Sequence, residues 1–357
     1  MDRDSAIIKT DNFSIRHEGE IHNGKVRSVY WLNQKDSSRI EEQFGVINSQ
    51  LGVMLVSDRI SAFDCIWEGE TLKGVPGKGA SLNAISEYWF KRFEEESLAG
   101  NHILATPHPL VWIVEKAEPV MIEAIARQYI TGSMWRAYER GKREFCGIQL
   151  PEGLKRNQRL DELLVTPSTK GIMKGIPGIR EKDDENITRD QIINNYRAFG
   201  FRSIEDVDLY EKLLLEGFDL ISKELNGLGK IFVDTKFELG YDGKGSMIYI
   251  DENGTPDSSR YWDSKLYEQG EAEEKSKERF REILLNGVPD KDVLLNKDRM
   301  AERIALAQNY RVSDEDMMKV SELYQGLSKQ ITGEEVPIIG NAREEIMDSL
   351  MPFGIIK

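Results

Sequence analysis

IFVDTKFELGYDGKGSMIYIDENGTPDSSR, residues 231–260, contains two apolar segments separated by a glycine-rich turn. Residues 231–239 have the pattern of a β-strand, in which successive side chains point to opposite faces. Asp234, Lys236 and Glu238 therefore share one face of the predicted strand. An acid, a base and a second acid on the exposed side of a core strand are unusual if the strand serves stability alone, so the stretch is a candidate functional site.

A returning strand is predicted at residues 247–250, and it delivers Asp251 and Glu252 near the same place. Carboxylates from two paired strands beside a lysine can hold Mg²⁺ and a polyphosphate, because Mg²⁺ prefers hard oxygen ligands and usually keeps substrate phosphates among them. The same pattern also fits a hairpin whose charged face is only solvated, since short motifs recur by chance.

Composition limits the class of protein. The 357 residues are enough for two domains, and the net charge of -14 argues against non-specific nucleic-acid binding, which needs a basic surface. Cys65 and Cys146 are far apart and form neither a disulfide framework nor a zinc motif. We expect no signal peptide, no membrane partner and a cytoplasmic location. The sequence does not distinguish a monomer from a homo-oligomer.

Two loops in the first third of the chain are candidates for anion binding. A hairpin is predicted at residues 13–32, and its glycine-containing loop is followed by Lys25 and Arg27. Backbone N–H groups and cations both favour phosphate, although an ordinary turn with exposed basic residues fits as well. The segment SDRISAFD, residues 57–64, follows a short predicted strand and suits either a binding loop or a capped turn.

Arg127 and Ser133 form a second candidate phosphate site. They follow a predicted strand at residues 120–126, and Ser133 stands where a helix begins. The free N–H groups at a helix start attract phosphate, but serine is also a common N-cap. The two roles are compatible.

Further along, residues 165–170 form a polar loop that precedes an irregular glycine-rich segment. Thr188 and Gln191 have capping-box spacing, so a helix is predicted to begin there. A long amphipathic helix is predicted at residues 204–225, and a charged helix at residues 271–285. Residues from about 288 to the end are predicted to be helical, and they contain no recognisable chemistry.

Taken in order, nine segments resemble one family, SAICAR synthetase. They are GKVRSVY, SDRISAFD, PGKGASLNAISEYWF, ARQYITGSMWRAY, LPEGL, TPSTK, DENIT, DTKFELG and IDENGTPDSSRYW. The resemblance covers about residues 20–285, with a weaker similarity at about residues 314–332. Nine motifs in the correct order are far more specific than any one of them.

The resemblance implies an α+β fold, with a small antiparallel N-terminal domain, a larger ATP-grasp-like domain and C-terminal helices. We expect a β-rich nucleotide-binding domain at residues 1–117 and a catalytic domain at residues 118–285. Residues 286–357 are expected to pack on the catalytic domain as a helical extension.

The resemblance also implies a reaction. SAICAR synthetases join the carboxylate of carboxyaminoimidazole ribonucleotide (CAIR) to the amine of L-aspartate and cleave ATP, with Mg²⁺ as a cofactor. The implied catalytic residues are Asp234 and Lys236, and the implied Mg²⁺ ligands are Glu238 and Asp251. The implied ATP-binding residues are Gly24, Lys25, Val26, Arg27, Ser28 and Glu123. The implied CAIR-binding residues are Asp58, Ser61, Asp64, Lys78, Arg127, Ser133 and Arg260.

The aspartate-binding residues implied by the resemblance are Thr169, Lys170 and Asp184. In this region the sequence departs from the family, which has a His-Asp pair where this chain has Asp183 and Asp184, after an apparent insertion at residues 172–182. An acid in place of histidine would weaken binding of an anionic amino acid. Two alternatives therefore stay open: a related ligase that uses a different amine, and a nucleotide-binding homologue without catalysis.

Overall fold

The structure is a computed structural model that describes residues 6–47 and 49–357. The chain divides into two compact units. Unit 1 comprises Met1–Tyr88, His102–Lys116 and Lys275–Lys357, and unit 2 comprises Trp89–Asn101 and Ala117–Glu274.

Unit 1 contains a five-stranded sheet of order β1-β2-β3-β7-β6, in which all neighbours are antiparallel. A separate two-stranded ribbon, β4-β5, carries the SDRISAFD segment. The strands are β1 (His22–Asn23), β2 (Arg27–Trp31), β3 (Leu51–Val56), β4 (Ile60–Ala62), β5 (Cys65–Trp67), β6 (Ile103–His108) and β7 (Val111–Glu115).

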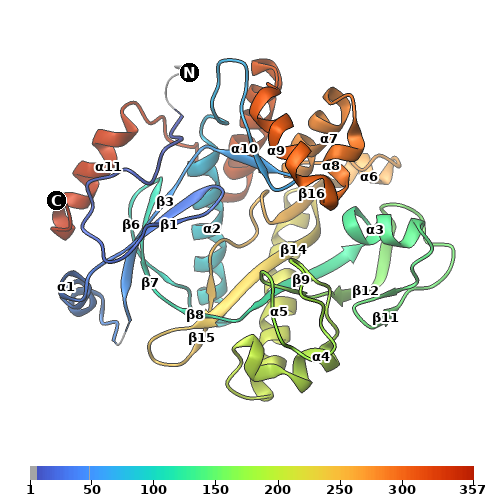
Figure 1. Ribbon diagram of the computed structural model, residues 1–357, viewed down its shortest axis with the longest axis horizontal. Coiled ribbons are helices and arrows are strands. Elements are labelled where there is room, and N and C mark those ends of the chain that lie inside the picture. The colour runs from blue at the N-terminus through green and yellow to red at the C-terminus, as the bar shows by residue number, and fades with distance from the viewer. Residues whose placement is uncertain (1–5, 48) are drawn as a thin grey trace. The chain divides into compact units, whose positions relative to one another are not determined.

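The helices of unit 1 come from both ends of the chain. In Figure 1, α11 lies beside β6, and the two elements are in contact. The α-helices are α1 (Gln34–Phe44), the first part of α2 (Lys78–Glu95), α7 (Lys277–Gly287), α8 (Lys291–Leu295), α9 (Met300–Asn309), α10 (Asp314–Thr332) and α11 (Ala342–Leu350). The 3₁₀ helices are η2 (Lys297–Arg299) and η3 (Met351–Phe353).

The C-terminal helices share one hydrophobic core with the N-terminal strands. Leu284, Tyr324 and Ile346 are buried in the same cluster as Leu55 and Ile113. This placement differs from the expectation that residues 286–357 pack on the domain at residues 118–285. The sequence shows an apolar stripe on each helix, but a stripe does not identify the surface that covers it.

Unit 2 is built around one long strand, β14 (Lys230–Tyr241), whose neighbours all run antiparallel to it. The path β12-β9-β14-β15 forms the sheet, β13 adds to β9, and β8 and β16 add to β14. The remaining strands are β8 (Glu118–Pro119), β9 (Ile122–Tyr129), β10 (Glu144–Phe145), β11 (Ile148–Gln149), β12 (Arg159–Val165), β13 (Ser168–Thr169), β15 (Met247–Ile250) and β16 (Ser259–Asp263).

Helix α5 (Glu205–Gly227) lies along β9 and β14, as Figure 1 shows. Its buried stripe is the predicted one, and Phe218 packs on Phe232 of β14 with ring centroids 4.8 Å apart. A Cβ at Gly217 would lie 2.9 Å from Phe237, so glycine is required for this close approach. The other helices are α3 (Gly132–Glu139), α4 (Arg189–Asn194), η1 (Tyr196–Phe199) and α6 (Ser264–Glu268).

Two predicted elements differ from the structure. The hairpin expected at residues 13–32 is reduced to β1 and β2, because the backbone around Ile15 pairs instead with Ile356 near the C-terminus. The helix expected from residue 271 begins at Lys277, because Glu274 instead accepts from the indole N–H of Trp262 at 2.8 Å. The antiparallel α+β fold itself is confirmed. Among the described helices, none combines the length and apolar character needed to cross a membrane.

Candidate active site

The acid, base and acid of β14 lie on one face of the unit 2 sheet, as their alternation predicts. Lys236 is the middle one of these three side chains. Its ammonium donates to Glu123 on β9 at 3.0 Å and to Glu238 at 2.9 Å. Burial alone would lower the pKa of Lys236, but the carboxylates of Glu238, Glu123 and Asp251 outweigh burial and raise the pKa. The lysine is therefore a fixed positive charge between carboxylates.

A second lysine reaches the same carboxylate. Lys170, just after β13, donates to Oε2 of Glu238, while Lys236 occupies Oε1. Burial opposes ionisation of Glu238, but the two ammonium groups outweigh it and hold the pKa well below its usual range. Strand β13 pairs with β9 in a register that sets Ser168 opposite Glu123, and the Ser168 hydroxyl donates to that carboxylate at 3.1 Å. The strand pairing thus brings together four charged side chains, which we call the charge cluster: Glu123, Lys170, Lys236 and Glu238.

Arg127, Asp234 and Arg260 form a row across three strands. Asp234 is the direct neighbour of Arg127 on β9 and of Arg260 on β16. Its Oδ2 accepts from Nη1 of Arg127 at 3.1 Å and from Nη1 of Arg260 at 2.6 Å. Arg127 also donates from Nε to Thr166, and among the described residues its Nη2 has no hydrogen-bond partner. One carboxylate therefore aligns two guanidinium groups, and Nη2 of Arg127 is left for a ligand.

The start of α3 approaches this row. Gly132 has a φ of 55°, and a Cβ there would lie 2.6 Å from Nη2 of Arg260. Ser133 is exposed in the first turn of α3, and the N-cap is Thr131, so Ser133 is not the cap. Free N–H groups at a helix start and two arginines together suit a phosphate monoester.

Of the aspartate-side residues, only Lys170 lies in the charge cluster. Thr169 is fully buried, and its hydroxyl accepts from the Glu185 N–H at 3.1 Å. Asp184, like Asp183, is exposed in the loop before α4, and it has a φ of 52°. The structure thus places Thr169 as a tether between β13 and this loop, and a substrate role for Thr169 or Asp184 stays a prediction.

The two predicted Mg²⁺ ligands, Glu238 and Asp251, both influence Lys236 electrostatically. Within the described residues, no group of three or more acids, histidines or cysteines is arranged to hold a metal ion. Mg²⁺ commonly takes one or two carboxylates and completes its shell with phosphates and water, so two carboxylates fit it. Lysines already contact both oxygens of Glu238, so a cation that binds there is repelled by two ammonium groups unless one lysine moves away.

The predicted ATP-binding residues of unit 1 lie at the β1–β2 turn. Gly24 donates its N–H to the carbonyl of Arg27 at 2.8 Å, and Lys25 pairs with Asp64 at 2.6 Å. The Val26 carbonyl accepts from Ser57, which attaches the turn to the SDRISAFD segment. The hydroxyl of Ser28 is buried against Thr10, so this side chain does not face a ligand.

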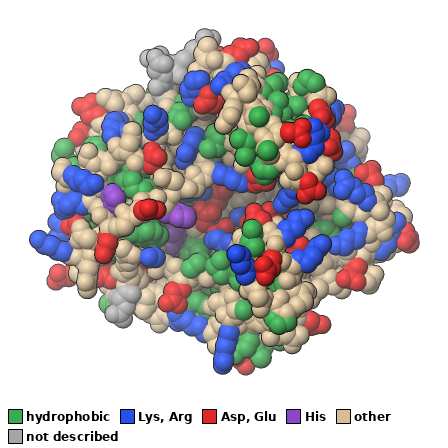
Figure 2. All heavy atoms as spheres, viewed as in Figure 1, with side chains coloured by type: hydrophobic (Ala, Val, Ile, Leu, Met, Phe, Trp, Pro, Cys, Tyr) green, Lys and Arg blue, Asp and Glu red, His purple; other side chains and the backbone are tan. Residues whose placement is uncertain are grey.

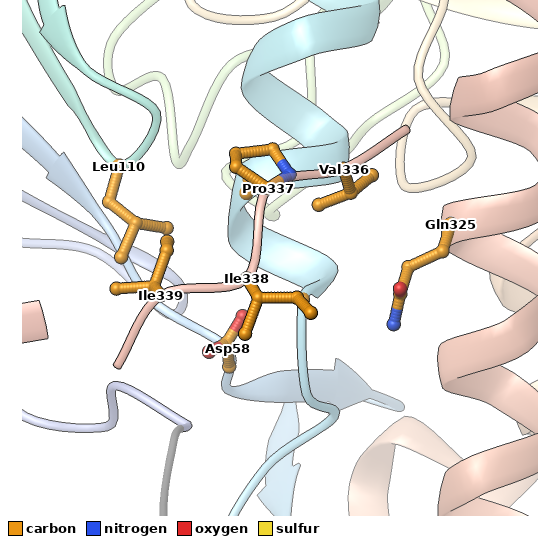
Figure 3. A pocket seen from close by; sticks show the side chains of 9 residues that line it. Asp58, Leu110, Gln325, Val336, Pro337, Ile338 and Ile339 are labelled. Carbon is orange, nitrogen blue, oxygen red and sulfur yellow. The ribbon is translucent and has the colours of Figure 1, made fainter. Parts of the chain in front are cut away.

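Two of the predicted CAIR-binding residues are deeply buried in unit 1. Asp58 accepts from the N–H groups of Ile7 and Gly79, at 3.0 and 2.8 Å. The cavity that it lines holds about 30 Å³ and is bordered by residues 336–339, which cross it in Figure 3. That volume is on the scale of a water molecule. Lys78 is fully buried, with its ammonium 5.4 Å from the centre of the Tyr324 ring.

Burial raises the pKa of Asp58 to about 6, although its two backbone donors and Lys78 oppose the shift. A raised folded-state pKa stabilises the protein below the unfolded-state pKa, and this contribution is lost as pH rises through the folded-state pKa. We therefore expect the free energy of unfolding to lose a contribution from Asp58 of on the order of 3 kcal/mol as the pH rises from about 4 to 6.

Asp58→Asn removes this titration. Urea denaturation of both proteins at pH 4.5 and 7.5 should show the variant gaining stability relative to wild type at the higher pH. Losses from altered hydrogen bonds do not depend on pH and cancel in the comparison. A difference between the two proteins that is the same at both pH values would contradict the assignment.

Ser61 is buried on β4, and Asp64 has a φ of 65°. Sequence reasoning missed the residue that helps to hold this segment: Arg303 of α9, which is 1% exposed. Arg303 donates to the carbonyl of Phe63 at 3.1 Å and lies 3.9 Å from Asp64. Nothing in the helical pattern of residues 300–309 distinguishes this arginine from a solvated one.

Acidic and basic side chains are interspersed over the face seen in Figure 2. On this face the cations are not gathered into a broad basic surface. This is consistent with a net charge of -14.

Comparison with known proteins identifies a matching family model and several relatives of the chain. A family model described as SAICAR synthetase matches residues 20–295. The relatives named phosphoribosylaminoimidazole-succinocarboxamide synthase include one from Vibrio vulnificus, 56% identical over 99% of each sequence. Others are from Vibrio parahaemolyticus, 57% identical over 98% of each, and Shewanella oneidensis, 56% identical over 97% of each.

Solved structures agree on the fold. The yeast SAICAR synthase complexed with SAICAR superposes with a TM-score of 0.68 at 24% identity, covering 92% of this chain and 99% of its own. A SAICAR synthetase in complex with ADP gives a TM-score of 0.58 at 21% identity, covering 88% and 99%. With relatives more than 50% identical along nearly its whole length, the chain belongs to the SAICAR synthetase family.

Proposed function

We infer that the chain joins CAIR to L-aspartate to give SAICAR, with cleavage of ATP to ADP and phosphate, in de novo purine biosynthesis. The observation that carries this inference is the near-full-length identity of 56–57% to relatives named for the reaction. The charge cluster and the arginine row of unit 2 provide groups suited to it.

The chemical problem is that a carboxylate is a poor electrophile. Transfer of the γ-phosphoryl group of ATP to a carboxylate oxygen of CAIR gives an acyl phosphate and ADP. The amine of L-aspartate then attacks the acyl carbon, phosphate leaves, and the amine loses a proton. The CAIR carboxylate, the ATP phosphates and the acyl phosphate are all anionic, so fixed positive charge and positioning supply most of the catalysis.

Lys236 is proposed to supply that charge beside the reacting carboxylate. Its two carboxylate contacts fix its position before substrate arrives. Asp234 is proposed to act by aligning Arg127 and Arg260, which together with Ser133 bind the ribose 5′-phosphate. Asp58, Ser61, Asp64 and Lys78 are proposed to bind or shape the imidazole side of CAIR.

ATP is proposed to bind at the β1–β2 turn, with Lys25 and Arg27 on its phosphates and backbone groups of Gly24, Val26 and Ser28 around them. Glu123 is proposed to contribute to the nucleotide site. Lys25 must exchange Asp64 for a phosphate, and this exchange is easy because both side chains are partly exposed. ADP in the solved relative supports a nucleotide site in the family.

Mg²⁺ is proposed to bind Glu238 and Asp251 and, when bound, neutralises phosphate charge during transfer. L-Aspartate is proposed to bind through Lys170, with Thr169 and Asp184 on the same side. Two cysteines without a disulfide and a role in nucleotide synthesis favour a cytoplasmic location.

The test is release of ADP from the purified chain with ATP, Mg²⁺ and CAIR, with L-aspartate compared with other amino acids and simple amines. Turnover with L-aspartate alone supports the proposed reaction. Turnover with another amine would identify the chain as a related ligase with a different amine substrate. The exposed Asp183 and Asp184, which replace the family's His-Asp pair, are the reason for testing this. No turnover with any amine would contradict the proposal and favour a non-catalytic homologue.

A further inference from the structure

Both carboxylate oxygens of Glu238 accept hydrogen bonds from lysines, Oε1 from Lys236 and Oε2 from Lys170. The Glu238 side chain is 9% exposed, so water reaches it poorly. The predicted metal ligand is thus neutralised by the protein itself. Any cation that binds Glu238 approaches an oxygen that already accepts from an ammonium group, and the two positive charges repel each other.

The two lysines differ in how firmly they are held. Lys236 forms salt bridges with two carboxylates, those of Glu123 and Glu238. Lys170 has Glu238 as its sole carboxylate partner in the described part of the chain, and its side chain is 33% exposed. The backbone after Lys170 leaves the strand at Gly171, with a φ of 73°. Lys170 is therefore the group that can leave.

Once displaced, Lys170 becomes a partly buried cation without a counterion. A second anion in the neighbourhood would then be favoured, and the amine substrate of the proposed reaction carries two carboxylates. This argument rests on the proposed function. We propose that Lys170 is a displaceable counterion of Glu238, which passes to a carboxylate of the amine substrate when a divalent cation binds Glu238.

The proposal makes metal binding and substrate binding mutually favourable. Each strengthens the other by the same factor, because coupling between two ligands is reciprocal. Couplings of this kind are typically about 5- to 150-fold. Lys170 also acts against the metal when no amine substrate is present, since its ammonium protects Glu238. Metal binding at Glu238 is thereby disfavoured until the amine substrate is present to bind Lys170.

The test is titration of the full chain with Mn²⁺, with free ion counted by electron paramagnetic resonance. Mn²⁺ shares the oxygen ligands and octahedral geometry of Mg²⁺. Wild-type affinity should rise at least about fivefold when L-aspartate is added, after correction for Mn²⁺ bound by L-aspartate itself. Lys170→Met should bind Mn²⁺ at least about fivefold more tightly than wild type without L-aspartate, and L-aspartate should then have little effect.

Lys174→Met is the matched control, because Lys174 is an exposed lysine in the loop that follows. It should behave like wild type, and Lys170→Arg should keep the dependence on L-aspartate. Wild-type affinity that ignores L-aspartate would overturn the proposal. So would equal or weaker Mn²⁺ binding by Lys170→Met, including no binding by either protein. If the chain turns over CAIR but the titrations give either of these results, only the proposed role of Lys170 is wrong. If the chain does not turn over CAIR, the proposed function itself is contradicted.

Discussion

Glu238→Gln is expected to lower the turnover number by about 100- to 1000-fold, the usual cost of removing a fixed charge from a preorganised site. The amide keeps the size of the side chain but cannot neutralise two lysines or hold a divalent cation. Lys236 retains Glu123 as a partner, and Lys170 is partly exposed, so the fold should survive.

The measurement is the rate of ADP release across a range of Mg²⁺ concentrations, with circular dichroism to confirm folding. The matched control is Glu216→Gln, which alters an exposed glutamate on α5 of the same unit. The control should retain wild-type turnover. Turnover by Glu238→Gln within a few-fold of wild type would remove this carboxylate from the proposed mechanism.

Arg260→Met is expected to raise the KM for CAIR by about 10- to 100-fold, because hydrogen bonds to a charged group contribute about 1.5–3 kcal/mol. The KM for ATP should change by less than about twofold. The effect should be specific, since Arg260 lies in the row with Asp234 and Arg127 beside the start of α3.

Initial rates with each substrate varied in turn distinguish the two constants. Arg140→Met serves as the control, because Arg140 is exposed at the end of α3. Equal rises in the KM values for CAIR and ATP would instead indicate a structural role for Arg260. Asp234→Asn should show the same selectivity if the carboxylate acts by aligning the two arginines.

The loop before α4 bears on the choice of amine. Thr169 donates its N–H to the carbonyl of Glu185 at 2.9 Å and accepts from the Glu185 N–H, which ties this loop to the strand that immediately precedes Lys170. The exposed Asp183 and Asp184 therefore lie on a segment attached to the charge cluster. The departures in residues 172–184 are thus connected to Lys170 through the contacts of Thr169 with Glu185.

Several elements of unit 2 could be predicted from the sequence. Strand β14 and its acid-base-acid face follow from two-residue alternation, and the buried stripe of α5 follows from helical periodicity. The capping box of Thr188 and Gln191 was predictable because both partners lie within one turn. These features depend on neighbouring residues, so local spacing contains the information.

Pairings between distant residues could not be predicted in this way. The Arg127–Asp234 contact spans 107 positions, and the contact of Arg303 with Phe63 spans 240. Motif resemblance named many of the residues but not their partners. Thr169 and Ser28 show the limit, because their hydroxyl groups bind the protein itself.

The sequence by itself determined the family, the antiparallel α+β class and the strand face that carries Asp234, Lys236 and Glu238, since these depend on motif order and local periodicity. Only the tertiary structure decided that the C-terminal helices share the core of the N-terminal strands, and that Lys170 holds Glu238. Strand register and the burial of apolar faces bring such groups together. Both are set by the packing of the whole chain, so no short segment encodes them.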